Sequence, residues 1–119
     1  MADSRDIDPK RVFEDLKDGR ILLVDVREPA EFAFERIHGS LLHPLSTFDP
    51  RSLPTDGSRK ILFQCGSGKR SRKALDTFIA ETGVDAAHMA GGIGAWKGAG
   101  LPCVRINAST GEVEDHGRY

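Results

Sequence analysis

Residues 60–83 read KILFQCGSGKRSRKALDTFIAETG, and this stretch contains three successive patterns. Residues 61–63 are apolar, which predicts a buried strand over 60–64, and the glycine-containing CGSGKR follows it directly. Apolar residues then recur at helical spacing over 71–82, so we expect a helix that ends at Gly83. A strand, a loop and a helix in this order are typical of an α/β fold with a parallel sheet.

The same alternation continues on both sides of this stretch. Ile21–Val24 is a continuous apolar run that stops at Asp25, which predicts a strand buried on both faces. Asp8 and Pro9 are typical of the start of a helix in the segment before it. Further short elements are expected at 29–36 (helix), 40–42 (strand), 86–89 (strand) and 91–100 (helix between glycines), with a loop at 46–58. We therefore predict an α/β domain of three layers, in which helices cover both faces of a central, mainly parallel sheet of about five strands.

The size and composition of the chain fit one small domain. It has 119 residues, 39% of them hydrophobic, and a formal charge of −1. We expect a core over about 7–106, with loose tails at 1–6 and at the polar, aperiodic 107–119. No apolar run approaches the ~18 residues of a membrane span, and the opening MADSRDIDPK lacks the apolar centre of a secretory signal. We therefore expect a cytoplasmic protein without a membrane partner.

Positive charge is concentrated in one short block. Residues 57–75 contain six cations and no carboxylate, namely Arg59, Lys60, Lys69, Arg70, Arg72 and Lys73. One basic block in a chain with a pI near 6.4 argues against a nucleic-acid partner. A small anionic ligand or a solvated basic face explains it better.

The loop that begins at Cys65 is the candidate functional site. Gly66 and Gly68 allow the backbone to curl, so that successive N–H groups face one concavity at the start of a helix. A thiol in such a loop should have a lowered pKa and should lie at the mouth of a shallow pocket. We predict Cys65 as the nucleophile, and as substrate-binding residues Gly66, Ser67, Gly68, Lys69 and Arg70. The competing interpretation is a buried, inert cysteine.

Four segments carry a resemblance to a known family. They are LLVDVREPAEF at 22–32, IHGSLLHPL at 37–45, CGSGKRS at 65–71 and MAGGIGAWKGAGLP at 89–102. In this order and spacing the chain resembles the rhodanese-like single-domain sulfurtransferases. The resemblance implies a rhodanese-like fold, no cofactor, and a Cys65 persulfide. That persulfide would take sulfur from thiosulfate or a related anionic donor and pass it to cyanide, a thiol or a sulfur-accepting protein.

Two other functions compete with sulfur transfer. Cysteine-dependent phosphatases and arsenate reductases place five residues between cysteine and arginine, whereas four separate Cys65 from Arg70 here, and Arg72 lies one position too far. A catalytically inactive protein-interaction module of the same fold is the other alternative, and the retained cysteine argues against it. Persulfide formation distinguishes sulfur transfer from both alternatives.

Several remaining residues have two interpretations each. Arg27 and Glu28 either line the pocket or serve the structure, and an ion pair of Glu28 or Asp25 with Arg70 is as reasonable as a substrate role. Trp96 is interpreted first as a packing residue. We expect Cys103 to be a packed or surface thiol rather than a partner of Cys65. Four scattered histidines and two distant cysteines give no basis for a metal site.

Overall fold

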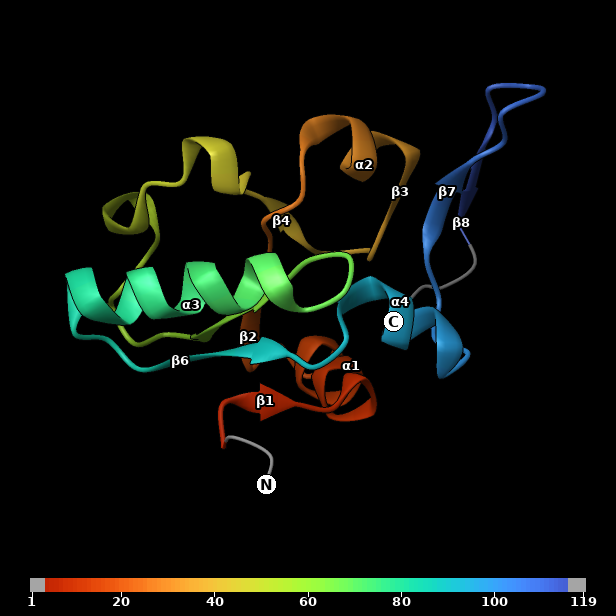
Figure 1. Ribbon diagram of the computed structural model, residues 1–119. Helices are drawn as coiled ribbons and strands as arrows, with labels where there is room; N and C mark the ends of the chain where they lie inside the picture. The colour runs from red at the N-terminus through yellow and green to blue at the C-terminus, as the bar shows by residue number, and fades with distance from the viewer. Residues whose placement is uncertain (1–3, 116–119) are drawn as a thin grey trace.

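The computed structural model describes residues 4–115 and contains a five-stranded central sheet (Figure 1). Its strands are β1 (Asp6–Ile7), β2 (Ile21–Asp25), β4 (Leu41–Leu42), β5 (Lys60–Gln64) and β6 (Ala86–Met89). Their order is β1-β6-β5-β2-β4, and all four neighbouring pairs are parallel. The predicted α/β architecture with a parallel five-stranded sheet is therefore confirmed.

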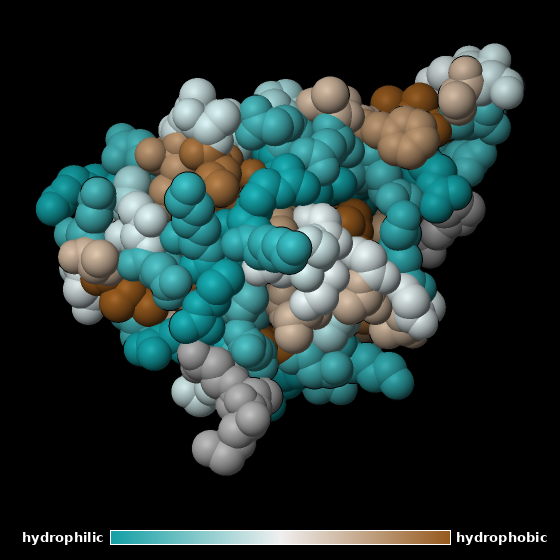
Figure 2. All heavy atoms as spheres, in the orientation of Figure 1, coloured by the Kyte–Doolittle hydropathy of each residue, from teal (hydrophilic) through white to brown (hydrophobic). Residues whose placement is uncertain are grey.

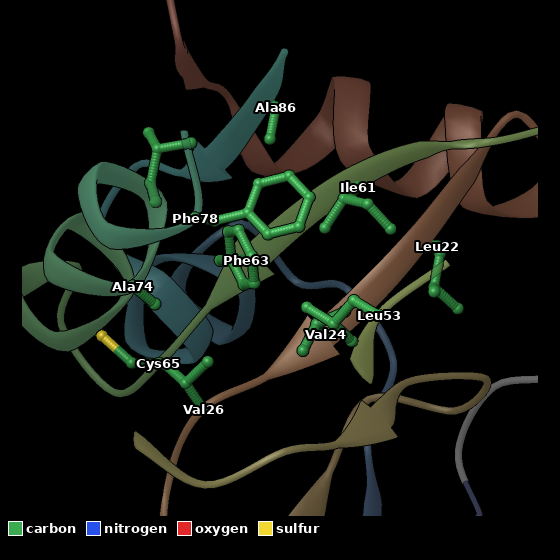
Figure 3. Close-up of a cluster of buried hydrophobic side chains, with 11 residues drawn as sticks. Leu22, Val24, Val26, Leu53, Ile61, Phe63, Cys65, Ala74, Phe78 and Ala86 are labelled. Carbon is green, nitrogen blue, oxygen red and sulfur yellow. The ribbon is translucent and has the colours of Figure 1, made fainter. Parts of the chain in front are cut away.

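Helices cover both faces of this sheet. They are α1 (Pro9–Lys17), α2 (Pro29–Phe34), α3 (Lys69–Thr82) and α4 (Gly92–Gly98), with 3-10 turns η1 (Leu45–Thr47) and η2 (Pro50–Ser52). Alternate residues of a strand point to opposite faces, so Leu22 and Val24 pack toward α3, whereas Ile21 and Leu23 pack toward α1 and α4. Figure 3 shows the cluster on the α3 face, with Cys65 within it.

Local sequence explains where the principal helices begin and end. The Asp8 side chain accepts a hydrogen bond from the Lys10 N–H at 3.0 Å, as a helix N-cap should, and Pro9 is the first residue of α1. Gly83 ends α3 with a φ of 69°, a conformation that glycine adopts without strain. Figure 2 shows mainly hydrophilic side chains over the outer surface of α3, with hydrophobic ones in separate areas. None of the helices within 4–115 is long and apolar enough to cross a membrane.

A second, antiparallel sheet was not predicted. It consists of β3 (Glu35–Arg36), β7 (Val104–Ile106) and β8 (Val113–Asp115). The β7–β8 hairpin forms the arm at the upper right of Figure 1. The expected loose tails are wrong at Asp6, which belongs to β1, and at Val113–Asp115, which form β8. The expected helix over 29–36 ends at Phe34. These strands have two or three residues each, too few to show an apolar alternation. The tail residues 1–3 and 116–119 lie outside the described part of the chain.

Buried charges join the two sheets. Arg27 is 5% exposed, and its guanidinium donates to the Asp25 carboxylate at 2.8 Å and to the Glu35 carbonyl oxygen at 2.6 Å. The Glu35 carboxylate in turn accepts hydrogen bonds from Lys97 and Arg105, both at 2.8 Å. Because paired buried charges avoid the desolvation penalty of isolated ones, this network holds β3 and β7 against the end of β2. Arg27 therefore has a structural role.

Candidate active site

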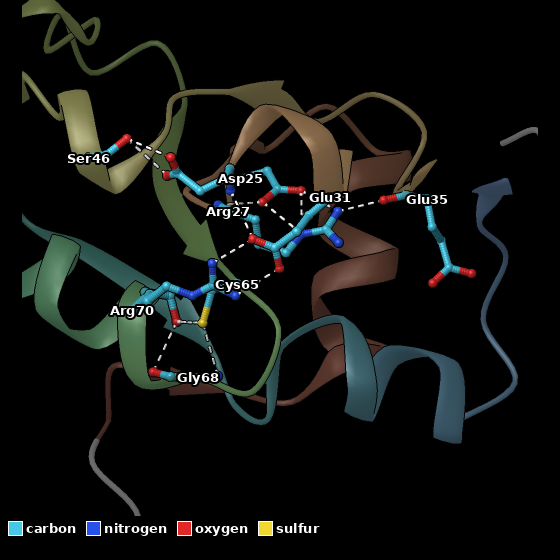
Figure 4. Close-up of polar contacts among 10 residues, drawn as sticks. Asp25, Arg27, Glu31, Glu35, Ser46, Cys65, Gly68 and Arg70 are labelled. Atoms are coloured by element: carbon cyan, nitrogen blue, oxygen red, sulfur yellow. Dashed lines mark hydrogen bonds and ion pairs between the residues drawn. The ribbon is translucent and has the colours of Figure 1, made fainter. Parts of the chain in front are cut away.

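The loop over 65–70 curls around the sulfur of Cys65 between β5 and α3 (Figure 4). Cys65 is 0% exposed, and its Sγ accepts a hydrogen bond from the Gly68 N–H at 3.1 Å. Gly68 has a φ of 107°, which lets the chain turn back over the sulfur. The 14-residue helix α3 starts at Lys69, so its positive end lies beside the thiol. The structure thus brings together the curled backbone and the helix N-terminus expected from the sequence.

The first turn of α4 fixes the orientation of this loop. The Ile93 N–H donates to the Cys65 carbonyl oxygen at 2.8 Å, and the Gly94 N–H donates to the Gly66 carbonyl oxygen at 3.1 Å. Because these carbonyls point toward α4, the N–H groups that follow in the chain are free to face the sulfur. Hydrogen bonds therefore hold the Cys65 loop against the start of α4.

The pKa of the Cys65 thiol lies below its ordinary value. Burial raises this pKa, but hydrogen bonds from the Ser71 hydroxyl and from the backbone N–H groups of Ser71, Gly68 and Ser67 outweigh the burial. These hydrogen bonds stabilise the thiolate more than the neighbouring cations do. The sequence predicted the direction of the shift, whereas the contribution of the Ser71 side chain was missed.

Arg70 forms a two-pronged ion pair with Glu31. The two guanidinium nitrogens donate to the two carboxylate oxygens at 2.7 and 3.0 Å, and this arginine holds the pKa of Glu31 at about 2. The proposed pairing of Arg70 with Glu28 or Asp25 is therefore wrong. Asp25 pairs with Arg27, and Glu28 accepts a hydrogen bond from the Ser46 hydroxyl at 2.8 Å. The available signal for Glu31 was its position in the first turn of the helix that Pro29 opens.

A cavity of about 520 Å³ lies beside the loop. It is lined by Asp6, Ser67, Gly68, Lys69, Arg72, His88, Ala90 and Gly91. Three of the predicted site residues therefore face it, but the buried sulfur of Cys65 does not. The expectation that the thiol lies at a pocket mouth is wrong, because the loop closes over the sulfur at Gly68.

Trp96 packs in the core rather than at this cavity. It is 0% exposed, its ring meets Phe13 edge to face at 5.7 Å, and its Nε1–H donates to the Pro102 carbonyl oxygen at 2.8 Å. Arg27 and Glu28 do not line the cavity either. All three residues thus have structural partners that account for their positions.

Cys103 is separated from Cys65 by the central sheet. It belongs to the hydrophobic cluster on the α1 face, whereas Cys65 belongs to the cluster on the α3 face. Burial raises the pKa of the Cys103 thiol, which disfavours its reactive thiolate. Within residues 4–115, no group of three or more His, Cys, Asp or Glu side chains is arranged to hold a metal ion.

Comparison with known proteins identifies the family. The rhodanese-like domain model matches residues 8–99. An uncharacterised protein of Synechocystis sp. is 39% identical over 100 residues, which cover 83% of this chain and 55% of that protein, so the chain spans about half of that relative. A sulfurtransferase of Allochromatium vinosum is 33% identical over 83% of this chain and 94% of its own length.

A solved structure shows the same relationship. The rhodanese-related protein of Thermoplasma volcanium superposes with a TM-score of 0.73 at 31% sequence identity. The match covers 84% of this chain and 97% of that one. The cysteine loop, the parallel sheet and these similarities agree, and the chain belongs to the rhodanese-like domain family.

Proposed function

We propose that this protein is a sulfurtransferase that carries sulfane sulfur on Cys65. The observation that carries the proposal is the Cys65 sulfur at the N-terminus of α3, hydrogen-bonded by the Gly68 N–H at 3.1 Å and with a lowered thiol pKa. Relatives named as sulfurtransferases support the same chemistry. The donor class is a small anion such as thiosulfate, and the acceptor is cyanide, a small thiol or a protein thiol.

The reaction proceeds in two displacements. The Cys65 thiolate attacks the outer sulfur of thiosulfate, a new S–S bond forms, and sulfite leaves with the electron pair of the bond that breaks. The resulting persulfide anion is stabilised by the N–H groups of the loop and by the helix dipole. An acceptor thiolate or cyanide then attacks the outer sulfur, and the Cys65 thiolate returns. The polar backbone of Gly66, Ser67 and Gly68 serves both steps.

The size of the loop favours sulfur over a phosphoryl group. Four residues separate Cys65 from Arg70, one fewer than in the cysteine-dependent phosphatases. The Arg70 guanidinium also forms a bidentate ion pair with Glu31, so the same two nitrogens are not available to bind a phosphoryl group. A bound sulfur atom needs less space than a phosphoryl group, which agrees with the close fit of the loop around Sγ.

Mass spectrometry of the intact protein tests this function. We expect incubation with thiosulfate to add the mass of one sulfur atom, and a thiol reductant to remove it. Peptide mapping should place the added sulfur on Cys65 and not on Cys103. Hydrolysis of an aryl phosphate without any added sulfur would exclude the proposal, and the absence of both reactions would favour the inactive interaction module.

Lys69→Ala should weaken the use of thiosulfate through electrostatics. Lys69 is exposed at the cavity, and none of the ion pairs described within 4–115 involves it. Removing a steering charge should lower kcat/KM for the doubly charged donor by about threefold to tenfold at low salt, and added salt should reduce the difference. Initial rates across a salt series measure the effect.

Lys73→Ala is the matched control for this variant. Lys73 is also exposed on α3 but lies one turn further along the helix and does not line the cavity. Its removal changes the net charge equally and should have a smaller effect on kcat/KM. An equal loss in both variants, or a loss that salt leaves unchanged, would contradict local steering by Lys69.

A further inference from the structure

A chain of hydrogen bonds leads from the Cys65 sulfur to Asp6. The Sγ of Cys65 lies 3.6 Å from the Ser71 Oγ, which lies 2.9 Å from the His88 Nδ1. The His88 Nε2 lies 2.5 Å from the Asp6 Oδ1. Ser71 is 0% and His88 6% exposed, so water does not compete freely for these contacts. The loop after β5 supplies Cys65, and α3, β6 and β1 supply Ser71, His88 and Asp6.

The Asp6 carboxylate fixes the direction of these hydrogen bonds. A carboxylate only accepts, so the His88 Nε2 carries a proton, and in the neutral imidazole Nδ1 is then an acceptor. The Ser71 hydroxyl has two acceptors within reach, the His88 Nδ1 at 2.9 Å and the Gly68 carbonyl oxygen at 3.1 Å. When it donates to the nearer Nδ1, its oxygen accepts from the Cys65 S–H. Every donor and acceptor in the chain is oriented toward the carboxylate.

Other charged groups lie near His88, some of them at the same cavity. The Arg72 guanidinium is 3.5 Å from the Asp6 Oδ1, and Lys69 lines the cavity with His88. On the β1 side, the Arg5 carbonyl oxygen accepts the His88 backbone N–H, while the Arg5 guanidinium pairs with Asp85. On the β5 side, the residue in register with His88 is the apolar Phe63. Asp6 is thus the acidic group that contacts the imidazole directly.

We propose that Ser71, His88 and Asp6 form a proton relay that converts the Cys65 thiol into the thiolate. The S–H bond breaks and its proton goes to the Ser71 Oγ, while the former hydroxyl proton of Ser71 goes to the His88 Nδ1. The products are a thiolate and an imidazolium, with no change in oxidation state. Asp6 stabilises the imidazolium, and the new Ser71 O–H points at the thiolate. His88 acts through Ser71 and is a positioning residue for the nucleophile.

The relay rests on the proposed sulfur transfer, but ionisation of Cys65 can be measured without any sulfur-transfer assay. In a Cys103→Ser background, only Cys65 contributes the thiolate absorbance in the far ultraviolet, and a pH titration reports its ionisation directly. His88→Asn preserves an amide able to hydrogen-bond to Ser71 but cannot take up a proton. We expect this variant to lower the thiolate fraction at neutral pH by about tenfold, the size of one hydrogen bond to a charged group.

Two further variants locate the effect. Ser71→Ala should lower the thiolate fraction by at least as much, and adding His88→Asn to it should cause little further loss, because both act through one chain of contacts. His43→Asn is the matched control, since the His43 ring also makes a polar contact, accepting the Asp49 N–H at 3.1 Å, but lies outside the relay. It should titrate like the parent protein. Thermal unfolding confirms that each variant is folded.

The outcomes separate the relay from simpler explanations. If His88→Asn titrates like the parent protein while Ser71→Ala does not, Ser71 acts alone and the relay is excluded. If His88→Asn does not fold, nitrogen NMR of His88 in the parent protein tests whether its ring takes up the Cys65 proton. A proton on Nδ1 should then appear together with the thiolate, and this coupling should vanish in Cys65→Ala. If the coupled ionisation of Cys65 and His88 is observed but thiosulfate adds no sulfur, the proposed sulfur transfer is refuted and the relay is not.

Discussion

Cys65→Ser is expected to abolish sulfur transfer while the fold remains intact. A serine hydroxyl is not ionised at neutral pH and cannot form a persulfide, so turnover with thiosulfate should fall roughly 10⁴-fold or more, to the background rate. The replacement is nearly isosteric, and the serine oxygen can still accept the Gly68 N–H that now bonds to sulfur. We therefore expect a change in stability of only about 1 kcal/mol.

The measurement combines activity, intact mass and thermal unfolding. The Cys65→Ser protein should show no added sulfur after thiosulfate treatment and a melting curve close to that of the parent protein. Cys103→Ser is the control, because this thiol lies in the cluster on the other face of the sheet and has a raised pKa. It should retain nearly full turnover. Equal loss of activity in both variants would instead indicate a two-thiol redox cycle.

The main parallel sheet could be predicted because its strands carry their own signal. The runs at 21–24 and 61–63 are apolar over their whole length, as burial on both faces requires. The second sheet has no comparable signal. Glu35–Arg36 and Val113–Asp115 are short and polar, and their pairing depends on a partner strand that is remote in sequence. Pairing of that kind leaves no local periodicity.

The candidate site shows the same limit. The loop over 65–70 could be located because glycines, a thiol and the start of a helix are adjacent in the sequence. The partner of Arg70 could not be predicted, because Glu31 is 39 residues away and Glu28 was an equally reasonable carboxylate. His88 was missed for the same reason, since Ser71 and Asp6 reach it only through the order of β1, β6 and β5.

Gly92 holds the loop in place, so Gly92→Ala should be strongly destabilising. Its φ is +60°, which an L-residue rarely adopts, and a Cβ there would lie 2.2 Å from the Cys65 carbonyl oxygen and 2.7 Å from the Gly66 carbonyl carbon. Both neighbours are backbone atoms that α4 holds by hydrogen bonds, so neither can move cheaply. We expect a loss of about 3 kcal/mol or more.

Gly98→Ala distinguishes this steric effect from the general cost of replacing a glycine in α4. A Cβ at Gly98 meets no atom within 4 Å and its φ is not positive, so alanine should leave stability unchanged or raise it slightly. Thermal unfolding should therefore show a Tm lower by roughly 10 °C in Gly92→Ala only. At temperatures below its melting transition, Gly92→Ala should also take up less sulfur from thiosulfate than the parent protein. The reason is that displacing the Cys65 carbonyl turns the loop N–H groups away from the sulfur. Equal melting temperatures for the two variants would refute the role of Gly92 in shaping the loop.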